Sequence, residues 1–417
     1  MRLIPARAAI ASAWAKFGSD SFWVLALQLV KQMLAVLVVA VLVRLISKEE
    51  FGRYQFVVTL ILVSTAFVLP SMQRMITQSV ARGHEGTFFA ASAACFRFSF
   101  LGTALMLALA GYFWFWEREP GQAVALAIGG VLFPFSNGLT QWQQLELGRR
   151  DFRGNSIRVS LGAVASSAAV ILLALLGVTD AGLLIAATVG VLAIQNLIQQ
   201  RISRRSVAPG ATVEEGALAY GYHASIWDGF NVVANYIDRI FVFAFVSPAG
   251  LAAYAVADRI PEVIKHNLQR LTLVLVPRFA ARERYTRQLD RKLMLVALVG
   301  AIGISIFALA ILPPLFVLLY TDAYAASLLY CQIILGSIAI SFFPILKKSF
   351  IDARLDAKGF RTITLWMSVV RIVAAGLLTY FWGALGAALS TVVYRMSSVA
   401  LTEYVIRTRY LNADRAP

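Results

Sequence analysis

Residues 228–270 read DGFNVVANYIDRIFVFAFVSPAGLAAYAVADRIPEVIKHNLQR, and they combine two apolar stretches with regularly spaced polar and charged residues. At about 100° per residue, the polar residues of each stretch fall on one face of a helix. A charge at the bilayer centre costs about 2.5 to 3.5 kcal/mol, so such faces are tolerated only toward a hydrated, protein-lined interior. The stretch therefore predicts two membrane-spanning helices that border a polar cavity. The polar faces comprise Asp228, Asn231, Asn235, Asp238 and Arg239 on the first helix, and Asp258, Arg259, Glu262, Lys265, His266, Gln269 and Arg270 on the second.

The composition of the whole chain agrees with a membrane protein. Hydrophobic residues make up 59% of the 417 positions and charged residues only 14%, which excludes a disordered chain and is atypical of a soluble domain. Apolar stretches of about 20 residues, long enough to cross a bilayer, predict an all-α polytopic membrane protein with twelve transmembrane helices. The predicted spans are 21–46, 55–79, 88–113, 121–145, 157–177, 181–200, 224–246, 250–276, 293–319, 325–346, 362–382 and 384–406.

A long interruption divides these spans into two groups of six. It predicts an N-terminal lobe over residues 1–200, a cytoplasmic linker over 201–222 and a C-terminal lobe over 223–417 with a short cytoplasmic tail. An internal repeat supports two pseudo-symmetric lobes: ISKEEFGRYQFVVTL from Ile46 and VSPAGLAAYAVADRI from Val246 align at an offset of 200 residues. Six helices per lobe give parallel repeats around a central cavity.

The basic residues indicate the orientation in the membrane. The formal net charge is +16, but nearly all Lys and Arg outside the spans fall on the side that holds both termini. The positive-inside rule then places both termini in the cytoplasm. This distribution argues against nucleic acid as a partner.

Bases outnumber acids within the spans. The basic residues are Lys31, Arg97, Arg239, Arg259, Lys265, Arg270, Arg371 and Arg395, against the acids Asp228, Asp238, Asp258 and Glu262. Some of these groups would form ion pairs that only fix helix packing, and Arg97 and Arg395 could extend to the interface. The surplus of bases nevertheless predicts an anionic ligand, since Arg suits bidentate phosphate contacts.

Further polar residues complete the predicted substrate site. Asn137 and Gln141 lie on a polar face of the fourth span, where amides could bind sugar hydroxyls or hydrogen-bond to neighbouring helices. The substrate-binding candidates are Lys31, Arg239, Arg259, Lys265, Arg270, Arg371, Asn231, Asn235, Asn137 and Gln141. The candidates for ion coupling or gating are Asp228, Asp238, Asp258 and Glu262, with a static ion pair as the alternative. No catalytic residue, metal site or cofactor is predicted, apart from H⁺ or Na⁺ as a coupling ion.

The segment EEFGRY at 49–54, its echo AGLAAY at 249–254 and the two six-helix lobes together resemble the polysaccharide-biosynthesis flippases. These are the Wzx-type O-antigen transporters of the multidrug/oligosaccharidyl-lipid/polysaccharide exporter (MOP) superfamily. The resemblance implies alternating access that moves a polyprenyl-pyrophosphate-linked oligosaccharide, such as an O-antigen repeat unit in lipopolysaccharide biosynthesis, from the inner to the outer leaflet. It also implies a glycan polymerase and a chain-length regulator as partners, beside the lipid bilayer.

Two other functions stay open from the sequence. The first is a cation-coupled multidrug or metabolite antiporter of the same superfamily, for which a cavity with more bases than acids is poorly suited. The second is a membrane-embedded glycan polymerase or ligase. The predicted outer loops are only a few residues long and leave little room for a catalytic loop, which favours a transporter over an enzyme.

Overall fold

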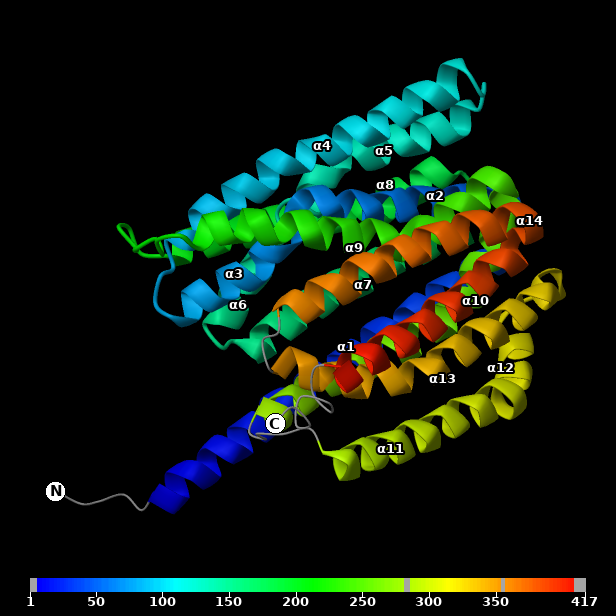
Figure 1. The fold of residues 1–417 in the computed structure, drawn as a ribbon. Coiled ribbons are helices and arrows are strands. Elements are labelled where there is room, and N and C mark those ends of the chain that lie inside the picture. Colours follow the sequence, from blue (N-terminus) through cyan, green and yellow to red (C-terminus); the bar gives the residue numbers. More distant parts are fainter. Residues whose placement is uncertain (1–5, 281–285, 354–356, 409–417) are drawn as a thin grey trace. The chain divides into compact units, whose positions relative to one another are not determined.

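The computed structural model describes the backbone of residues 6–280, 286–353 and 357–408, and the side chains of 26–268, 286–350 and 365–408. These residues are helical almost throughout, and no strand occurs among them. The predicted all-α fold is confirmed (Figure 1). Eight helical segments of the described chain are long and apolar enough to cross a membrane, so the protein is a multi-pass membrane protein.

The twelve predicted spans each correspond to helical structure, although several are interrupted. The helices are α1 (Ala6–Leu45), α2 (Lys48–Ser64), α3 (Pro70–Ala81), α4 (Thr87–Phe115), α5 (Pro120–Ser136), α6 (Trp142–Gly148), α7 (Phe152–Leu175), α8 (Ala181–Ser206), α9 (Ala217–Phe245), α10 (Pro248–Ala280), α11 (Arg287–Ile306), α12 (Leu312–Leu319), α13 (Ala325–Ala353) and α14 (Ala357–Ile406).

The interruptions have local causes. Leu69 adopts a left-handed conformation (φ 56°) directly before Pro70, so the second span divides into α2 and α3. The fourth span contains Pro134, which removes a helical hydrogen bond, and divides into α5 and α6. Gly383 (φ 58°, ψ −139°) kinks α14 between the eleventh and twelfth predicted spans. Only glycine adopts that conformation readily, so Gly383 lets the chain reverse there almost without a loop.

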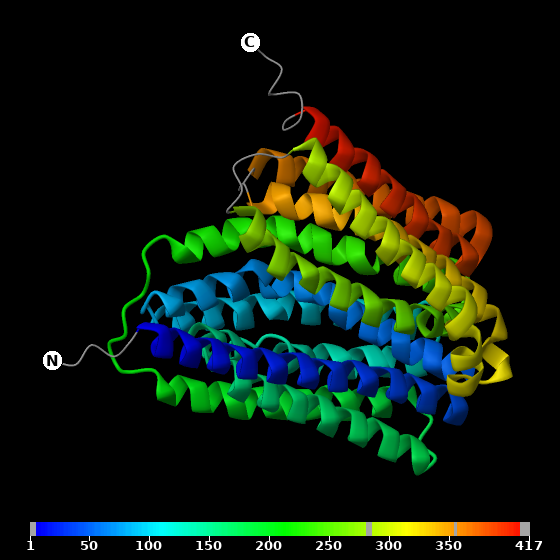
Figure 2. The same cartoon turned by 90° about the horizontal axis from the view of Figure 1, so that it is seen from below.

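The chain forms two compact units. Unit 1 comprises residues 1–45 and 60–232, and unit 2 comprises 46–59 and 233–417. Within unit 1, α7 packs against α1 and α8, and α5 packs against α4 and α8 (Figure 2). Within unit 2, α13 packs against α10, α11 and α14 (Figure 1). The unit boundaries fall inside α2 and α9, and the division into lobes of six helices stays a prediction.

The internal repeat has a structural counterpart inside unit 2. Ser47 Oγ accepts a hydrogen bond from the Glu50 N–H (3.2 Å) before α2, and Ser247 Oγ accepts one from the Gly250 N–H (3.0 Å) before α10. Both serines therefore cap their helices in the same way. Gly52 faces the backbone of Pro248 at a separation that a Cβ atom would not fit. The two capped ends thus meet where Gly52 permits close backbone contact.

Candidate binding site

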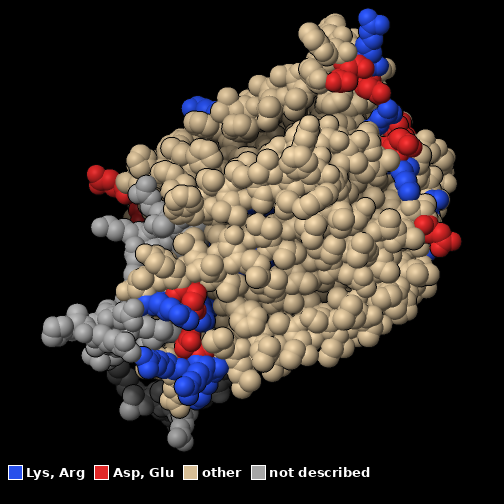
Figure 3. All heavy atoms as spheres, turned by 45° about the vertical axis from the view of Figure 1, so that its right-hand side comes forward, with Lys and Arg blue, Asp and Glu red and all other residues tan. Residues whose placement is uncertain are grey.

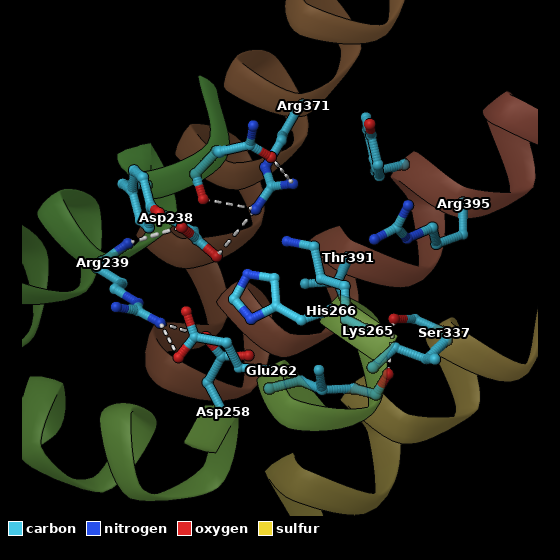
Figure 4. A pocket seen from close by; sticks show the side chains of 15 residues that line it. Asp238, Arg239, Asp258, Glu262, Lys265, His266, Ser337, Arg371, Thr391 and Arg395 are labelled. Atoms are coloured by element: carbon cyan, nitrogen blue, oxygen red, sulfur yellow. Dashed lines mark hydrogen bonds and ion pairs between the residues drawn. The ribbon is translucent and has the colours of Figure 1, made fainter. Parts of the chain in front are cut away.

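A polar pocket of about 130 Å³ lies inside unit 2 (Figure 4). Helices α9, α10, α13 and both halves of α14 supply its lining. The residues are Asn235, Tyr236, Asp238, Arg239, Asp258, Glu262, Lys265, His266, Ile334, Ser337, Ile338, Arg371, Thr391, Tyr394 and Arg395. Four of these are strong bases and three are acids, so the pocket has more positive than negative groups.

One half of the pocket is close to neutral. Arg239 Nη2 lies 2.6 Å from Asp258 Oδ2 and 3.6 Å from Glu262 Oε2. Arg259, next to the pocket lining, approaches the same Glu262 carboxylate at 3.0 Å. Only 8% of the Arg239 side chain is exposed, so this guanidinium depends on the two carboxylates for the stabilisation that water would otherwise supply.

A second pairing involves Asp238 and Arg371. The Tyr254 hydroxyl donates to Asp238 Oδ2 at 2.7 Å, and Arg371 Nη2 lies 3.7 Å from the same oxygen. Arg371 also donates to the Asn235 backbone carbonyl (2.9 Å) and to its side-chain oxygen (3.2 Å). These contacts fix Arg371 on the first half of α14 against α9 (Figure 4).

The other half of the pocket carries bases without acids. Among the described residues, Lys265 and Arg395 form no ion pair, and Arg395 Nε is buried without a hydrogen-bond partner. The Arg395 guanidinium lies over the Tyr394 ring, with 4.9 Å to the centroid, and Arg371 approaches the same ring at 5.1 Å. Figure 4 shows Lys265 and Arg395 extending toward the same space as Arg371. Like charges in a partly buried site repel, so this arrangement suits an anion that bridges them.

The pocket has room for a small anion. Its volume of about 130 Å³ accommodates a phosphate or diphosphate group. Guanidinium and ammonium groups give strong charge-assisted hydrogen bonds to phosphate oxygens. The pocket therefore carries the groups that recognition of a small oxyanion would require.

Comparison with known families assigns the chain. The sequence profile described as "Polysaccharide biosynthesis protein" matches residues 41–338, which is more than half of the chain. The chain belongs to the polysaccharide biosynthesis protein family. The predicted family relationship is therefore confirmed. No match was found among curated proteins.

Solved structures show that this family member shares the fold of MOP-superfamily transporters. An inward-facing multidrug resistance MATE family transporter is similar at a TM-score of 0.68 and 13% identity, over 92% of this chain and 96% of that one. The lipid II flippase MurJ, in an inward closed conformation, is similar at 0.65 and 13% identity, over 92% and 87%. A MOP transporter from Pyrococcus furiosus, described as having a binding pocket of reversed polarity, is similar at 0.55 and 12% identity, over 95% of each chain.

The pocket brings together half of the residues predicted from sequence. They are Asn235, Asp238, Arg239, Asp258, Glu262, Lys265 and Arg371. Arg259 contacts the pocket through Glu262. The side chain of Arg270 lies outside the described residues. The functional roles of all these residues stay predictions.

The other predicted residues belong to unit 1 and do not line this pocket. Lys31 is half-buried on α1, Asn231 lies on the unit 1 part of α9, Asn137 follows α5, and Gln141 is fully buried before α6. Asp228 forms an ion pair with Arg74 and accepts a hydrogen bond from the Ser71 hydroxyl, both on α3. Its observed contacts are those of a structural ion pair.

Sequence reasoning missed several lining residues. The sequence left open that Arg395 extends to the membrane interface, but Arg395 lines the pocket together with Tyr394 and Thr391. Arg371 and Arg395 stand on opposite sides of Gly383, so the reversal of α14 brings them to one site. The signal was the presence of one Arg in each of two consecutive apolar spans. Without knowing which faces pack together, that signal could not be distinguished from two interfacial arginines.

Proposed function

We propose that this protein is a flippase that moves a polyprenyl-pyrophosphate-linked oligosaccharide across the bacterial cytoplasmic membrane by alternating access. The observation that carries the proposal is the pair of bases, Lys265 and Arg395, that face the pocket without acid partners. Membership of the polysaccharide biosynthesis family supports a glycan-linked substrate. The flippase MurJ, similar in fold, supports a lipid-linked one.

The size and charge of the pocket indicate which part of the substrate binds there. The pyrophosphate binds at Lys265, Arg395 and Arg371, while the oligosaccharide lies outside this pocket of about 130 Å³. Moving sugar hydroxyls through hydrocarbon would leave many polar groups without hydrogen bonds, each at a cost of several kcal/mol. A protein-lined hydrated path removes that cost, and the prenyl chain stays in the lipid. O-antigen repeat units are the proposed class of glycan.

Coupling to an ion gradient is part of the proposal. The Arg239 guanidinium and the carboxylates of Asp258 and Glu262 share one network beside the anion site. When a pyrophosphate enters, its negative charge competes with the carboxylates for the bases. The carboxylates then gain affinity for H⁺ or Na⁺, so substrate and cation occupancy are linked.

A drug antiporter is the second candidate, because the MATE transporters similar in fold include multidrug resistance proteins. A cationic drug would need an available carboxylate. In this pocket Asp238 accepts from Tyr254, and Asp258 and Glu262 both contact Arg239. Binding a cation would break these pairs and add positive charge beside Lys265 and Arg395. The flippase therefore fits the pocket better.

Transport assays with the purified full chain in liposomes distinguish the flippase from the drug antiporter. A flippase moves a fluorescent polyprenyl-pyrophosphate oligosaccharide to the opposite leaflet and does not transport cationic dyes. The amide variants D238N, D258N and E262Q should lower the dependence of flipping on an imposed H⁺ or Na⁺ gradient. Dye transport that is lost in these variants, with no flipping of lipid-linked glycan by the unaltered protein, would establish the antiporter instead.

A further inference from the structure

His266 on α10 is the histidine that lines the pocket in unit 2. It lies within a predicted membrane span, away from the ends of α10. Figure 3 shows that most charged side chains on one face of the molecule lie along two edges of that face. A charge within a span is costly unless polar or charged surroundings compensate it. The protonation state of His266 therefore depends on the other charges in the pocket.

The position of His266 lets its charge act on both halves of the pocket. His266 follows Glu262 by four residues, so the two side chains share one face of α10. It also directly follows Lys265 in the sequence. Figure 4 shows the imidazole ring in the middle of the pocket, between the Glu262 carboxylate and the bases Lys265 and Arg371. A proton on this ring would add a further cation beside the anion site.

The imidazole of His266 is accessible, as a group that exchanges protons with water must be. His266 is exposed, whereas Asp238 is buried and Asp258 and Glu262 are only partly exposed. Each of these three carboxylates also contacts an arginine. Protonating a carboxylate would therefore weaken an ion pair of the pocket. Protonating His266 instead adds a positive charge.

The charges of the protein alone oppose a proton on His266. Among the described residues, the other charged or titratable groups that line the pocket come from α9, α10 and α14, and none comes from α13. They are Tyr236, Asp238, Arg239, Asp258, Glu262, Lys265, Arg371, Tyr394 and Arg395. Four bases thus face three acids, and Arg259 adds a further base beside Glu262. Nearby like charges disfavour the charged form of a titratable group, so this excess favours the neutral imidazole.

A pyrophosphate diester removes this excess of positive charge. In a lipid-linked oligosaccharide the pyrophosphate is esterified at both ends, so it carries two negative charges. Bound among Lys265, Arg371 and Arg395, it favours a proton on the neighbouring imidazole. The carboxylates gain affinity for protons as well, but their ordinary pKa values are about 4, whereas that of histidine is about 6.5. At neutral pH the imidazole is therefore the group that responds.

We propose that His266 takes up a proton when the pyrophosphate binds and thereby becomes an additional cationic group of the substrate site. This inference rests on the proposed function and adds to it a binding residue whose contribution depends on pH. Ligand binding and proton binding are linked reciprocally. Because the bound state holds more protons than the free state, the substrate binds more tightly as pH falls.

Calorimetric titration of the purified full chain tests this role, with farnesyl pyrophosphate esterified to N-acetylglucosamine as the ligand. This diester has no group of its own that titrates between pH 6 and pH 8. Binding heats in two buffers of different ionisation enthalpy give the number of protons taken up. We expect uptake at pH 7, and binding about tenfold tighter at pH 6 than at pH 8, since one pKa unit of linkage is a factor of ten.

Two failures are distinguishable in the unaltered protein. Binding without proton uptake, at equal affinity across this pH range, would overturn the role of His266 and leave the proposed function standing. No binding at any pH, in folded protein, would overturn the proposed function and this inference with it.

Variants assign the proton to His266. H266Q should abolish the proton uptake and bind with nearly the same affinity at pH 6 and pH 8. H266R carries a permanent positive charge and should bind at pH 8 about as tightly as the unaltered protein does at pH 6. H223Q is the matched control and should keep the pH dependence, because His223 on α9 is exposed and does not line the pocket. Proton uptake that persists in H266Q, or that is lost in H223Q, would overturn the assignment.

Discussion

Two charged clusters, one in each unit, differ in how completely their charges are matched. At the helix ends of unit 1, Glu214 pairs with Arg82 and Glu85 pairs with Arg149. In the pocket of unit 2, Arg239 is matched by acids, whereas Lys265 and Arg395 are not. Matched pairs at a surface hold segments together. Unmatched bases in a buried pocket cost stability, and a ligand that supplies the missing charge explains them best.

The unit 1 cluster fastens the connection that precedes α9. The Gly86 N–H donates to the Thr212 carbonyl at 2.9 Å, and the Glu214 N–H donates to Thr87 Oγ1 at 2.9 Å. Glu214 also accepts from the Ser79 hydroxyl. Residues 212–214, within the predicted linker over 201–222, are therefore held against the start of α4.

The largest expected effect is on stability, from R239Q. The variant removes the base that the partly buried carboxylates of Asp258 and Glu262 share, at an expected cost of up to about 3 kcal/mol. Unfolding in detergent, followed by circular dichroism, measures the loss. K265Q is the contrasting variant, because it removes a base without an acid partner and should leave stability unchanged or raise it. Equal destabilisation by both variants would show that the two halves of the pocket do not differ.

The next effect is on transport, at Arg395. R395Q should lower the rate of lipid-linked glycan flipping about 10- to 100-fold, since a hydrogen bond to a charged group is worth about 1.5 to 3 kcal/mol. R395K retains the charge and should keep part of the activity. A lysine variant as inactive as the glutamine variant, in protein shown to be folded, would point to a packing role for Arg395.

A smaller effect tests the repeated helix caps. S47A and S247A each remove the side-chain oxygen that accepts the third N–H of its helix, at an expected cost of about 1 kcal/mol each. Similar losses in thermal unfolding would support functional equivalence of the two caps. A loss of stability confined to one variant would show that the repeated sequence does not stabilise both helices equally.

The smallest effect is a pH dependence in unit 1. The hydrogen bond from Arg149 lowers the pKa of Glu85 below its usual value of 4.5. The stabilisation is therefore fully present above about pH 5 and is lost as pH falls through the lowered pKa. For this partly exposed pair it should be below about 1 kcal/mol. Comparing R149Q with the unaltered protein at pH 7 and pH 4 measures it, and a stability difference that grows at pH 4 would contradict the assignment.

The fold was largely predictable because long apolar stretches and polar helix faces indicate membrane spans directly. Residues such as Asp258 and Lys265 could be assigned to a cavity because a charge in a span must face polar surroundings. This argument could not distinguish Asp228, which does not line the pocket, from Asp238, which does. Both lie on the polar face of α9, yet one pairs with Arg74 and the other accepts from Tyr254. Their partners come from distant segments, which helical periodicity does not reveal.

The central claim is that the unmatched bases bind the pyrophosphate of the transported lipid. The most direct measurement is the affinity of the purified protein for polyprenyl pyrophosphate, compared with the K265Q/R395Q double variant. Its control is K292Q/R291Q, which removes two exposed charges on α11. We predict a loss of at least about 100-fold in the pocket variant, from two charged contacts, and little change in the control. Unchanged affinity in the folded pocket variant, or an equal loss in the control, would contradict the account.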